Sequence, residues 1–430
     1  MSEDWQETSL EMAEPSGGGL RDEISRLLEE LARHGGGPAE AGVTRLLYDS
    51  AWSGGQRYLA EEMRAAGLEA HFDNVGNLYG KLPGRDPALP AVLTGSHVDT
   101  VRHGGKYDGA YGIAAGIAAL AELKRKFGTP LRPLEVASFC EEEGSRFPLA
   151  YWGSGNATGR YEWRSGGEYA DSAGTTLSEA MTAAGFGLPD RDDCRRSDLA
   201  AFVELHIEQG MVLEYFDKRI GIVDTIVGQR RYAVSLEGAA NHAGTTPMTL
   251  RQDAMTGAAE IAVKLESLAS QWGEPLVATV GRLEARPNTP NVIAGSVDFT
   301  IDIRHADEWK LSAFSELILS EVERIATRRR LRFAVKPWLT TKPVPLSAAL
   351  AARTEAICRS LSLPCKRMVS GAGHDAQLFP PLCPTTMIFV PSRAGISHSP
   401  QEYTSPEQLA DGAAVLFNLL YELAYKEQSP

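Results

Sequence analysis

The sequence predicts an α/β protein with a smaller α+β domain inserted into it. Short apolar strands alternate with helical stretches in the first half of the chain and again near its end. Between these parts, alternating strands and two helices follow the order strand–helix–strand–strand–helix–strand, which is typical of a two-layer sandwich. Distinctive His, Asp and Glu residues follow several of the apolar strands, where α/β sheets collect ligands. With 430 residues, 43% of them hydrophobic, the chain is long enough for two domains.

The first part of the chain is predicted to be a catalytic domain. Residues 1–19 end in a Gly-rich run, and we expect a disordered tail there. Apolar residues recur at helical spacing over 20–33, and a second helix is expected at 53–66. The other elements predicted here are an alanine-rich helix at 110–127 and strands at 68–72, 77–82, 91–95 and 134–140.

Residues 225–340 are predicted to form the inserted domain. Its first strand, Val227–Gly238, alternates apolar and polar residues, as a half-buried strand does. The remaining elements predicted for it are helices at 252–270 and 308–328 and strands at 276–283, 297–304 and 331–338. The α/β pattern then resumes, with a strand at 387–390. The catalytic domain is therefore expected to comprise 20–224 and 341–430.

Composition bounds the function. A formal charge of −13 argues against nucleic acid or a membrane surface as a partner, and an anionic substrate would require locally concentrated arginines. Five cysteines without framework spacing favour a reducing compartment. No secretory signal and no run of 18 apolar residues is visible. We therefore expect a cytoplasmic protein.

Five residues are candidate metal ligands because imidazoles and carboxylates suit a divalent ion, and a carboxylate can bridge two ions. They are His97, Asp108, Glu143, His206 and His398. Singly, each has an ordinary explanation: a core or surface histidine, a turn aspartate, or a member of a solvated acidic run. Asp99 strengthens the case, because from a strand end its carboxylate could accept the second ring proton of His97. A metal pair holding a shared water would indicate hydrolysis.

Several segments carry a family resemblance that covers nearly the whole chain from about Gly42. They are Gly95-Ser-His-Val-Asp-Thr, Glu204-Leu-His-Ile-Glu-Gln-Gly, Val227-Gly-Gln-Arg-Arg-Tyr, Asn241-His-Ala-Gly-Thr-Thr-Pro-Met, Arg286-Pro-Asn-Thr and Ser370-Gly-Ala-Gly-His-Asp-Ala-Gln. Together they resemble the dinuclear metallohydrolases of the aminoacylase/carboxypeptidase superfamily, in particular the amidohydrolase branch that acts on ureido compounds. His206 is typical of that branch, because the peptidase branch has a carboxylate there. The resemblance implies an exopeptidase-like catalytic domain with an inserted lid and dimerisation domain.

The resemblance also implies a role for each metal candidate. His97 and His206 would hold one metal, Glu143 and His398 the other, and Asp108 would bridge the two. Two divalent ions per subunit are expected, with Mn²⁺ favoured and Zn²⁺ or Co²⁺ possible. Glu142 matches the family's general base, which exchanges a proton between the attacking water and the leaving nitrogen.

The candidate substrate contacts lie mostly on the insert. The resemblance assigns them to Gln209, Arg231, Asn291, Arg304, His242, Gly371 and His374. An arginine fork matches a carboxylate and a side-chain amide complements a ureido group, although a surface strand arginine is the ordinary interpretation. In relatives His242 reaches the partner subunit's site, which implies a homodimer through the insert. The segment from Gly371 is expected to open a helix that could receive an anion, while His374 could equally be a cap or packing residue.

The resemblance implies a small anionic ureido substrate, with allantoate favoured. Hydrolysis would give ureidoglycine, ammonia and CO₂. An N-carbamoyl-L-amino acid or β-ureidopropionate hydrolase is the alternative, followed by an aminoacylase or dipeptidase. A binding protein that has lost its metals need not keep Glu142 beside Glu143, yet both are present.

Overall fold

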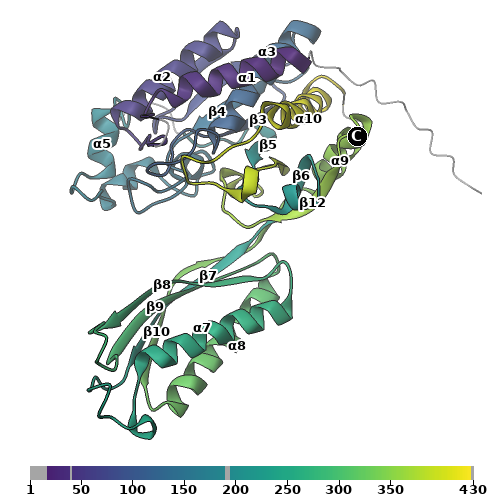
Figure 1. Cartoon of the computed structure of the whole chain (residues 1–430). Coiled ribbons are helices and arrows are strands. Elements are labelled where there is room, and N and C mark those ends of the chain that lie inside the picture. The colour runs from purple at the N-terminus through teal and green to yellow at the C-terminus, as the bar shows by residue number, and fades with distance from the viewer. Residues whose placement is uncertain (1–16, 39–40, 189–193, 428–430) are drawn as a thin grey trace, which may run out of the picture. The chain divides into compact units, whose positions relative to one another are not determined.

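The computed structural model describes residues 17–38, 41–188 and 194–427 (Figure 1). They cluster into two compact units, each described here by itself. Unit 1 contains the chain up to Asp224 together with Leu346–Met368 and the residues from His374 onward. Unit 2 comprises Thr225–Pro345 and the short segment Val369–Gly373, which we had placed in the larger domain. None of the helices in the described ranges has the length and apolar character needed to cross a lipid bilayer.

Nine strands form a mixed sheet, which confirms the α/β class; most of this sheet belongs to unit 1, while β11 and the last residues of β6 and β12 fall in the segments assigned to unit 2. Along the sheet the order is β1-β2-β4-β3-β5-β13-β6-β11, and β12 also pairs with β6. Parallel pairs join β3 to β4 and β5, and β5 to β13, whereas the outer pairs are antiparallel. The strands are β1 Glu69–Phe72, β2 Leu78–Leu82, β3 Ala91–His97, β4 Leu134–Phe139, β5 Leu199–Ile207, β6 Ile220–Ile226, β11 Val344–Pro345, β12 Cys365–Ser370 and β13 Thr385–Val390.

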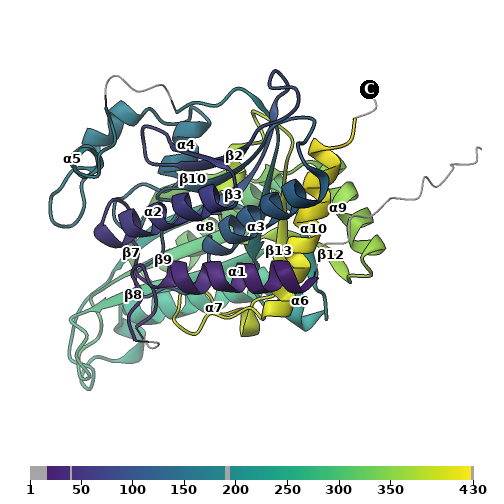
Figure 2. The ribbon, with the colours of Figure 1, turned by 90° about the horizontal axis from the view of Figure 1, so that it is seen from above.

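Three helices pack against one another over this sheet: α1 (Gly17–Ala32), α3 (Ala110–Phe127) and α10 (Pro406–Ala424). Figure 2 shows them side by side, although they come from the beginning, middle and end of the chain. Strands β3, β4 and β13 are buried along their whole length, so their apolar residues occupy both faces of the sheet and do not alternate with exposed polar ones. The remaining helices are α2 Ser50–Ala65, α4 Trp152–Ala157, α5 Leu177–Ala183, α6 Val212–Tyr215 and α9 Ala348–Ser360, with short 3₁₀ helices at Trp163–Glu168, Asp375–Leu378 and Arg393–Gly395.

Helix boundaries follow local capping. The predicted helix 53–66 is α2, which begins three residues earlier because the side chain of Asp49 accepts a hydrogen bond from the backbone N–H of Trp52. Helix α1 already includes Gly17–Gly19, which we expected in the tail, while the tail's residues 1–16 lie outside the described ranges.

Unit 2 is a four-stranded antiparallel sheet with two helices on one face (Figure 1). Its elements are β7 Gly228–Glu237, a 3₁₀ turn Met248–Leu250, α7 Ala254–Trp272, β8 Val277–Arg286, β9 Ser296–His305, α8 Glu308–Arg328 and β10 Arg332–Thr341, with the strands in the order β10-β7-β9-β8. Along β9 every second residue, from Val297 to Ile303, is buried against the helices. The intervening residues, including Asp302 and Arg304, therefore lie on the opposite face of the sheet.

Candidate active site

Four neighbouring strands bring the predicted ligands to one edge of the unit 1 sheet. Strands β4, β3, β5 and β13 run parallel, so their carboxyl ends meet at that edge. His97 is the last residue of β3, and His206 is the penultimate residue of β5. Glu142 and Glu143 follow β4, and His398 lies in the loop after β13.

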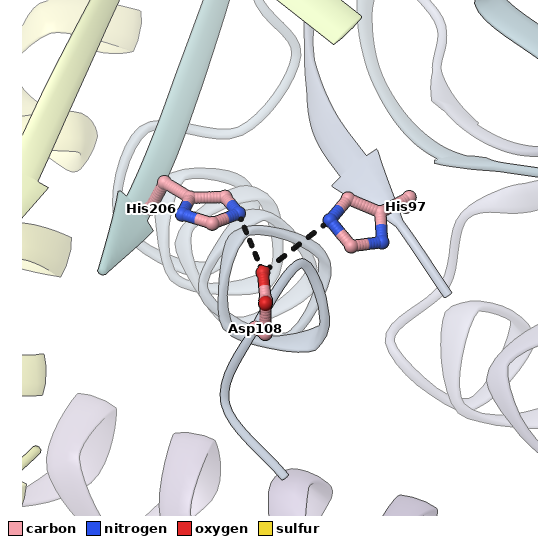
Figure 3. Close-up of side chains that lie close together, drawn as sticks. All are labelled: His97, Asp108 and His206. Atoms are coloured by element: carbon pink, nitrogen blue, oxygen red, sulfur yellow. Dashed lines mark ion pairs between the residues drawn. The ribbon is translucent and has the colours of Figure 1, made fainter. Parts of the chain in front are cut away.

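The carboxylate of Asp108 lies between two groups of ligand atoms. Its Oδ1 is 3.5 Å from Nε2 of His97 and 3.2 Å from Nε2 of His206, and Figure 3 shows both rings directed at it. Its Oδ2 is 3.2 Å from Nε2 of His398, whose Nε2 is 3.4 Å from Oε1 of Glu143. The structure thus brings the five predicted ligands together as two sets that share Asp108, and each set lies within the spacing of a metal shell.

Electrostatics favour an ionised carboxylate at the centre. Burial alone would raise the pKa of Asp108, but hydrogen bonds from the imidazoles of His206, His398 and His97 hold it well below its usual range. The hydrogen bond that the His398 imidazole donates to Asp108 raises the pKa of His398 to about 9. A metal cation bound between Asp108 and these imidazoles would stabilise the ionised carboxylate in the way that the imidazole protons do in this structure.

Backbone carbonyls orient the two buried imidazoles. Nδ1 of His97 lies 3.0 Å from the carbonyl oxygen of Asp99, and Nδ1 of His206 lies 2.8 Å from that of Ile207. In each ring Nε2 is therefore left to face Asp108, an arrangement typical of metal-binding histidines.

The predicted contact between the Asp99 carboxylate and the His97 ring is wrong. That carboxylate accepts the backbone N–H of Glu142 at 3.2 Å and of Glu143 at 3.1 Å. The chain turns after β3, so the side chain of Asp99 points to the loop after β4 rather than along the strand end. Asp99 therefore fixes the two consecutive glutamates instead of a ring proton.

Glu142 is buried beside the two ligand sets. Its Oε2 is 4.0 Å from Nε2 of His97, while its neighbour Glu143 contacts the other set. Burial raises the pKa of Glu142 well above its ordinary value, and the nearby charge of His97 opposes this shift. A buried carboxyl group with a raised pKa is suited to accepting and returning a proton.

His374 packs against the site rather than opening a helix toward a ligand. It is buried, and its ring lies edge-on to His206 with ring centroids 4.6 Å apart. The expected helix is only a four-residue 3₁₀ turn, whose Ala376 N–H is already donated to Glu204 at 2.8 Å. The predicted helix is therefore wrong, whereas substrate contact by Gly371 and His374 stays a prediction.

Gln209 contacts the candidate bridge directly. With φ +58°, it turns its side chain so that Nε2 donates to Oδ2 of Asp108 at 2.9 Å and to Oγ of Ser397 at 3.1 Å. Ser397 also donates to Oε2 of Glu402. We predicted neither Ser397 nor Glu402, although their positions beside His398 were a signal that could have found them.

The two predicted substrate arginines share a partner on unit 2. Nε of Arg231 donates to Oδ2 of Asp302 at 2.8 Å, and Arg304 binds both oxygens of the same carboxylate. Arg304 also donates from Nη1 to the carbonyl oxygen of Gly371 at 2.7 Å. Burial raises the pKa of Asp302, but the two arginines reverse that effect and lower it. The guanidinium groups are thus held in place by a carboxylate that we did not predict.

His242 and Asn291 are exposed neighbours elsewhere on unit 2. A backbone bridge joins His242 to Val292, and Ala243 donates its N–H to the carbonyl oxygen of Asn291 at 2.9 Å. Nδ1 of His242 accepts the N–H of Gly244 at 3.0 Å. These residues, like Arg231 and Arg304, belong to a different unit from the metal-ligand candidates.

Comparisons with known proteins identify the family of this chain. The sequence profile of Peptidase family M20/M25/M40 matches residues 93–422. Allantoate amidohydrolase of Bacillus subtilis (strain 168) is 45% identical over 406 residues, 94% of this chain and 98% of that protein. Allantoate amidohydrolase of Escherichia coli (strain K12) is 44% identical over 408 residues, 95% of this chain and 99% of that protein.

An N-carbamoyl-L-amino-acid amidohydrolase of Pseudomonas sp. (strain NS671) is 37% identical over 384 residues, 88% of this chain and 92% of that protein. Among solved structures, an amidase of the hydantoinase/carbamoylase family from Burkholderia multivorans has a TM-score of 0.91 and 34% identity, and covers 94% of this chain and 98% of its own. The similarity extends through both units. This chain is therefore a member of Peptidase family M20/M25/M40.

Proposed function

We propose that this protein hydrolyses a ureido C–N bond with two divalent metal ions, and that its substrate is allantoate. The observation that carries the reaction class is the position of Asp108. Its two carboxylate oxygens face two separate ligand sets, one with two imidazoles and one with an imidazole and a carboxylate. A carboxylate with a purely structural role would not need a separate set of metal-ligating side chains at each of its two oxygens.

The residues present fit a metal pair. His97 and His206 would hold one ion, and Glu143 and His398 the other. Imidazole nitrogens and carboxylate oxygens suit Mn²⁺, Zn²⁺ and Co²⁺, and we propose Mn²⁺ as the physiological ion. When bound, such a pair supplies a water of lowered pKa and polarises the carbonyl of the scissile bond.

Glu142 would carry the proton in this reaction. Its buried carboxylate lies next to the ligands without belonging to the Asp108 contacts, so it is free to accept a proton from the attacking water. It would return the proton to the leaving nitrogen. Asp99 would keep Glu142 in place through the backbone, and Gln209 would present its amide beside the scissile group.

Unit 2 would bind the anionic end of the substrate. It contains 15 basic and 13 acidic residues, which gives unit 2 a net charge of +2. Because the whole chain has a net charge of −13, the rest of the chain carries −15. Allantoate carries one carboxylate and two ureido arms on a single carbon. Arg304 and Arg231 are the candidate holders of its carboxylate, and Asn291 of the second arm. His242 would stabilise the oxyanion in the partner's site.

Identity favours allantoate over an N-carbamoyl-L-amino acid. The two allantoate amidohydrolases are 44–45% identical to this chain, against 37% for the carbamoyl-amino-acid enzyme. The second candidate remains an N-carbamoyl-L-amino acid hydrolase, because the solved amidase structure belongs to the hydantoinase/carbamoylase family. We further propose a homodimer through unit 2 and, since all five cysteines are free thiols, a cytoplasmic location.

The test is a substrate panel with the Mn²⁺-loaded protein. Ammonia release would be measured with allantoate, N-carbamoyl-L-amino acids, N-acyl amino acids and dipeptides. We expect the highest kcat/KM for allantoate. A higher value for N-carbamoyl amino acids would replace the substrate with the second candidate, and turnover of dipeptides alone would refute ureido hydrolysis.

A further inference from the structure

Glu402 joins the two loops that carry Asp108 and His398. Its Oε1 accepts the backbone N–H groups of Tyr107 at 3.0 Å and of Asp108 at 3.1 Å. Its Oε2 accepts the hydroxyl of Ser397, the residue before His398, at 2.8 Å. One carboxylate therefore fixes segments that are about 290 residues apart in the sequence.

The carboxylate of Glu402 is buried against the backbone of Gly105. Glu402 is 5% exposed, and a Cβ built on Gly105 would lie 2.1 Å from its Oε1. Gly105 thus allows the loop before Asp108 to close onto Glu402. A buried carboxylate that accepts three hydrogen bonds from two loops holds those loops at a set spacing.

The two ligand sets differ in how firmly they are held without Glu402. The imidazoles of His97 and His206 are buried, and a backbone carbonyl orients each. The side chain of His398 is 50% exposed, and within the described residues no backbone carbonyl binds its ring. Its alignment with Oδ2 of Asp108, at 3.2 Å, depends on the loop that Ser397 ties to Glu402.

We propose that Glu402 is a positioning residue for the second metal site, formed by Asp108, Glu143 and His398. This inference rests on the proposed function, since it assumes a metal pair. Glu402 sets the distance between Asp108 and His398, whereas the site of His97 and His206 retains its own supports. Loss of a group that orients metal ligands typically costs about 10–100-fold in metal affinity.

In the experiment, the full-length protein is treated with a chelator and then titrated with Mn²⁺ in a calorimeter, which measures the number of ions bound and the affinity for each. The variants are Glu402→Ala and the equally sized Glu402→Gln. The matched control is Asp73→Ala, because Asp73 also accepts two backbone N–H groups, from Val75 and Asn77, but contacts none of the ligands. Circular dichroism would check that each variant is folded.

We expect two ions bound by the wild type and by Asp73→Ala. Glu402→Ala should bind one ion within about threefold of the wild-type affinity and the other about 10–100-fold more weakly. Glu402→Gln should lie between, because its amide oxygen can still accept the two N–H groups. Unchanged affinity for both ions in Glu402→Ala, or an equal loss at both sites, would overturn the inference. If Glu402→Ala does not fold, the same two outcomes in Glu402→Gln decide. Failure of the wild type to bind a metal pair would instead refute the proposed function.

Discussion

Arg304 binds the carboxylate of Asp302 with two parallel hydrogen bonds, from Nε at 3.1 Å and from Nη2 at 2.9 Å. The planar guanidinium is therefore fixed in one orientation before any substrate arrives. A substrate carboxylate would therefore bind a side chain that is already ordered, so that less side-chain entropy is lost on binding.

Replacing Arg304 with Lys should raise KM about tenfold or more while changing kcat little, because a point charge cannot reproduce the fork and hydrogen bonds to charged groups contribute about 1.5–3 kcal/mol. Steady-state kinetics with allantoate would measure this. Arg282→Lys is the control, since Arg282 lies exposed on the same sheet and pairs, among the residues that the structure describes, only with Glu284. An unchanged KM for Arg304→Lys would remove this residue from the substrate site.

Glu142→Gln should bind both metals and keep its fold but lose kcat by roughly 10²–10⁴-fold, the usual cost of losing a general base. The amide has the same size and lacks a basic oxygen of comparable strength. Metal content and kcat would be measured on the same preparation. More than about a tenth of wild-type kcat would contradict the assignment.

Asp99→Ala should separate two roles that the sequence could not distinguish. The ring of His97 is bound by the backbone carbonyl of residue 99, so its metal affinity should persist. Glu142 and Glu143 lose the acceptor of their N–H groups, so we expect roughly 10²-fold lower kcat and a weaker second metal site. Equal weakening of both metal sites would show instead that the Asp99 side chain supports His97.

The pH dependence of stability should change sign when metal is removed. Asp108 raises the pKa of His398 from 6.5 to about 9, so the metal-free protein gains stability from the protonated ring below pH 6.5 and loses it as the pH rises to about 9. Metal binding requires neutral imidazole, so the stabilisation by Mn²⁺ should grow over the same range. Thermal unfolding at pH 6 to 9 would test this. His398→Gln should have a shallower slope without metal, and an identical slope would contradict the assignment.

Mixing two inactive variants tests whether His242 acts across a dimer. A His242→Ala chain supplies Glu142, and a Glu142→Gln chain supplies His242 to its partner. If His242 completes the partner's site, each mixed dimer contains one intact site, and exchange of subunits should restore about a quarter of wild-type activity. Action within one chain predicts no recovery at all. Sedimentation would confirm that the samples are dimeric.

The sequence predicted the parts of the site that depend on local order. His97 and His206 were found because each closes an apolar strand, and parallel strands must deliver their ends to one edge. The order of elements in unit 2 was also predicted, since period-two strands and period-3.6 helices differ clearly there.

Contacts that depend on loop direction or on register between distant segments could not be predicted. Asp302 lies opposite Arg231 only because β7 and β9 pair in that register, and a shift of one residue would have placed it on the other face. Glu402 meets Asp108 across 294 positions, a separation at which no spacing rule applies. The side chain of Asp99 follows a turn after the strand, where alternation ends.

The position of β13 has a consequence for biosynthesis. This buried strand lies between β5 and β6, yet it is made after the whole of Thr225–Pro345. On the ribosome, unit 2 can complete its sheet while unit 1 still has a gap in the middle of its own. The edges of β5 and β6 then stay unpaired until the last 50 or so residues emerge, which also bring His398. If synthesis terminates before residue 385, we expect unit 2 to fold while the rest of the chain is prone to aggregate. Because His398 is also made last, we expect the complete metal pair to bind only after the whole chain has been synthesised.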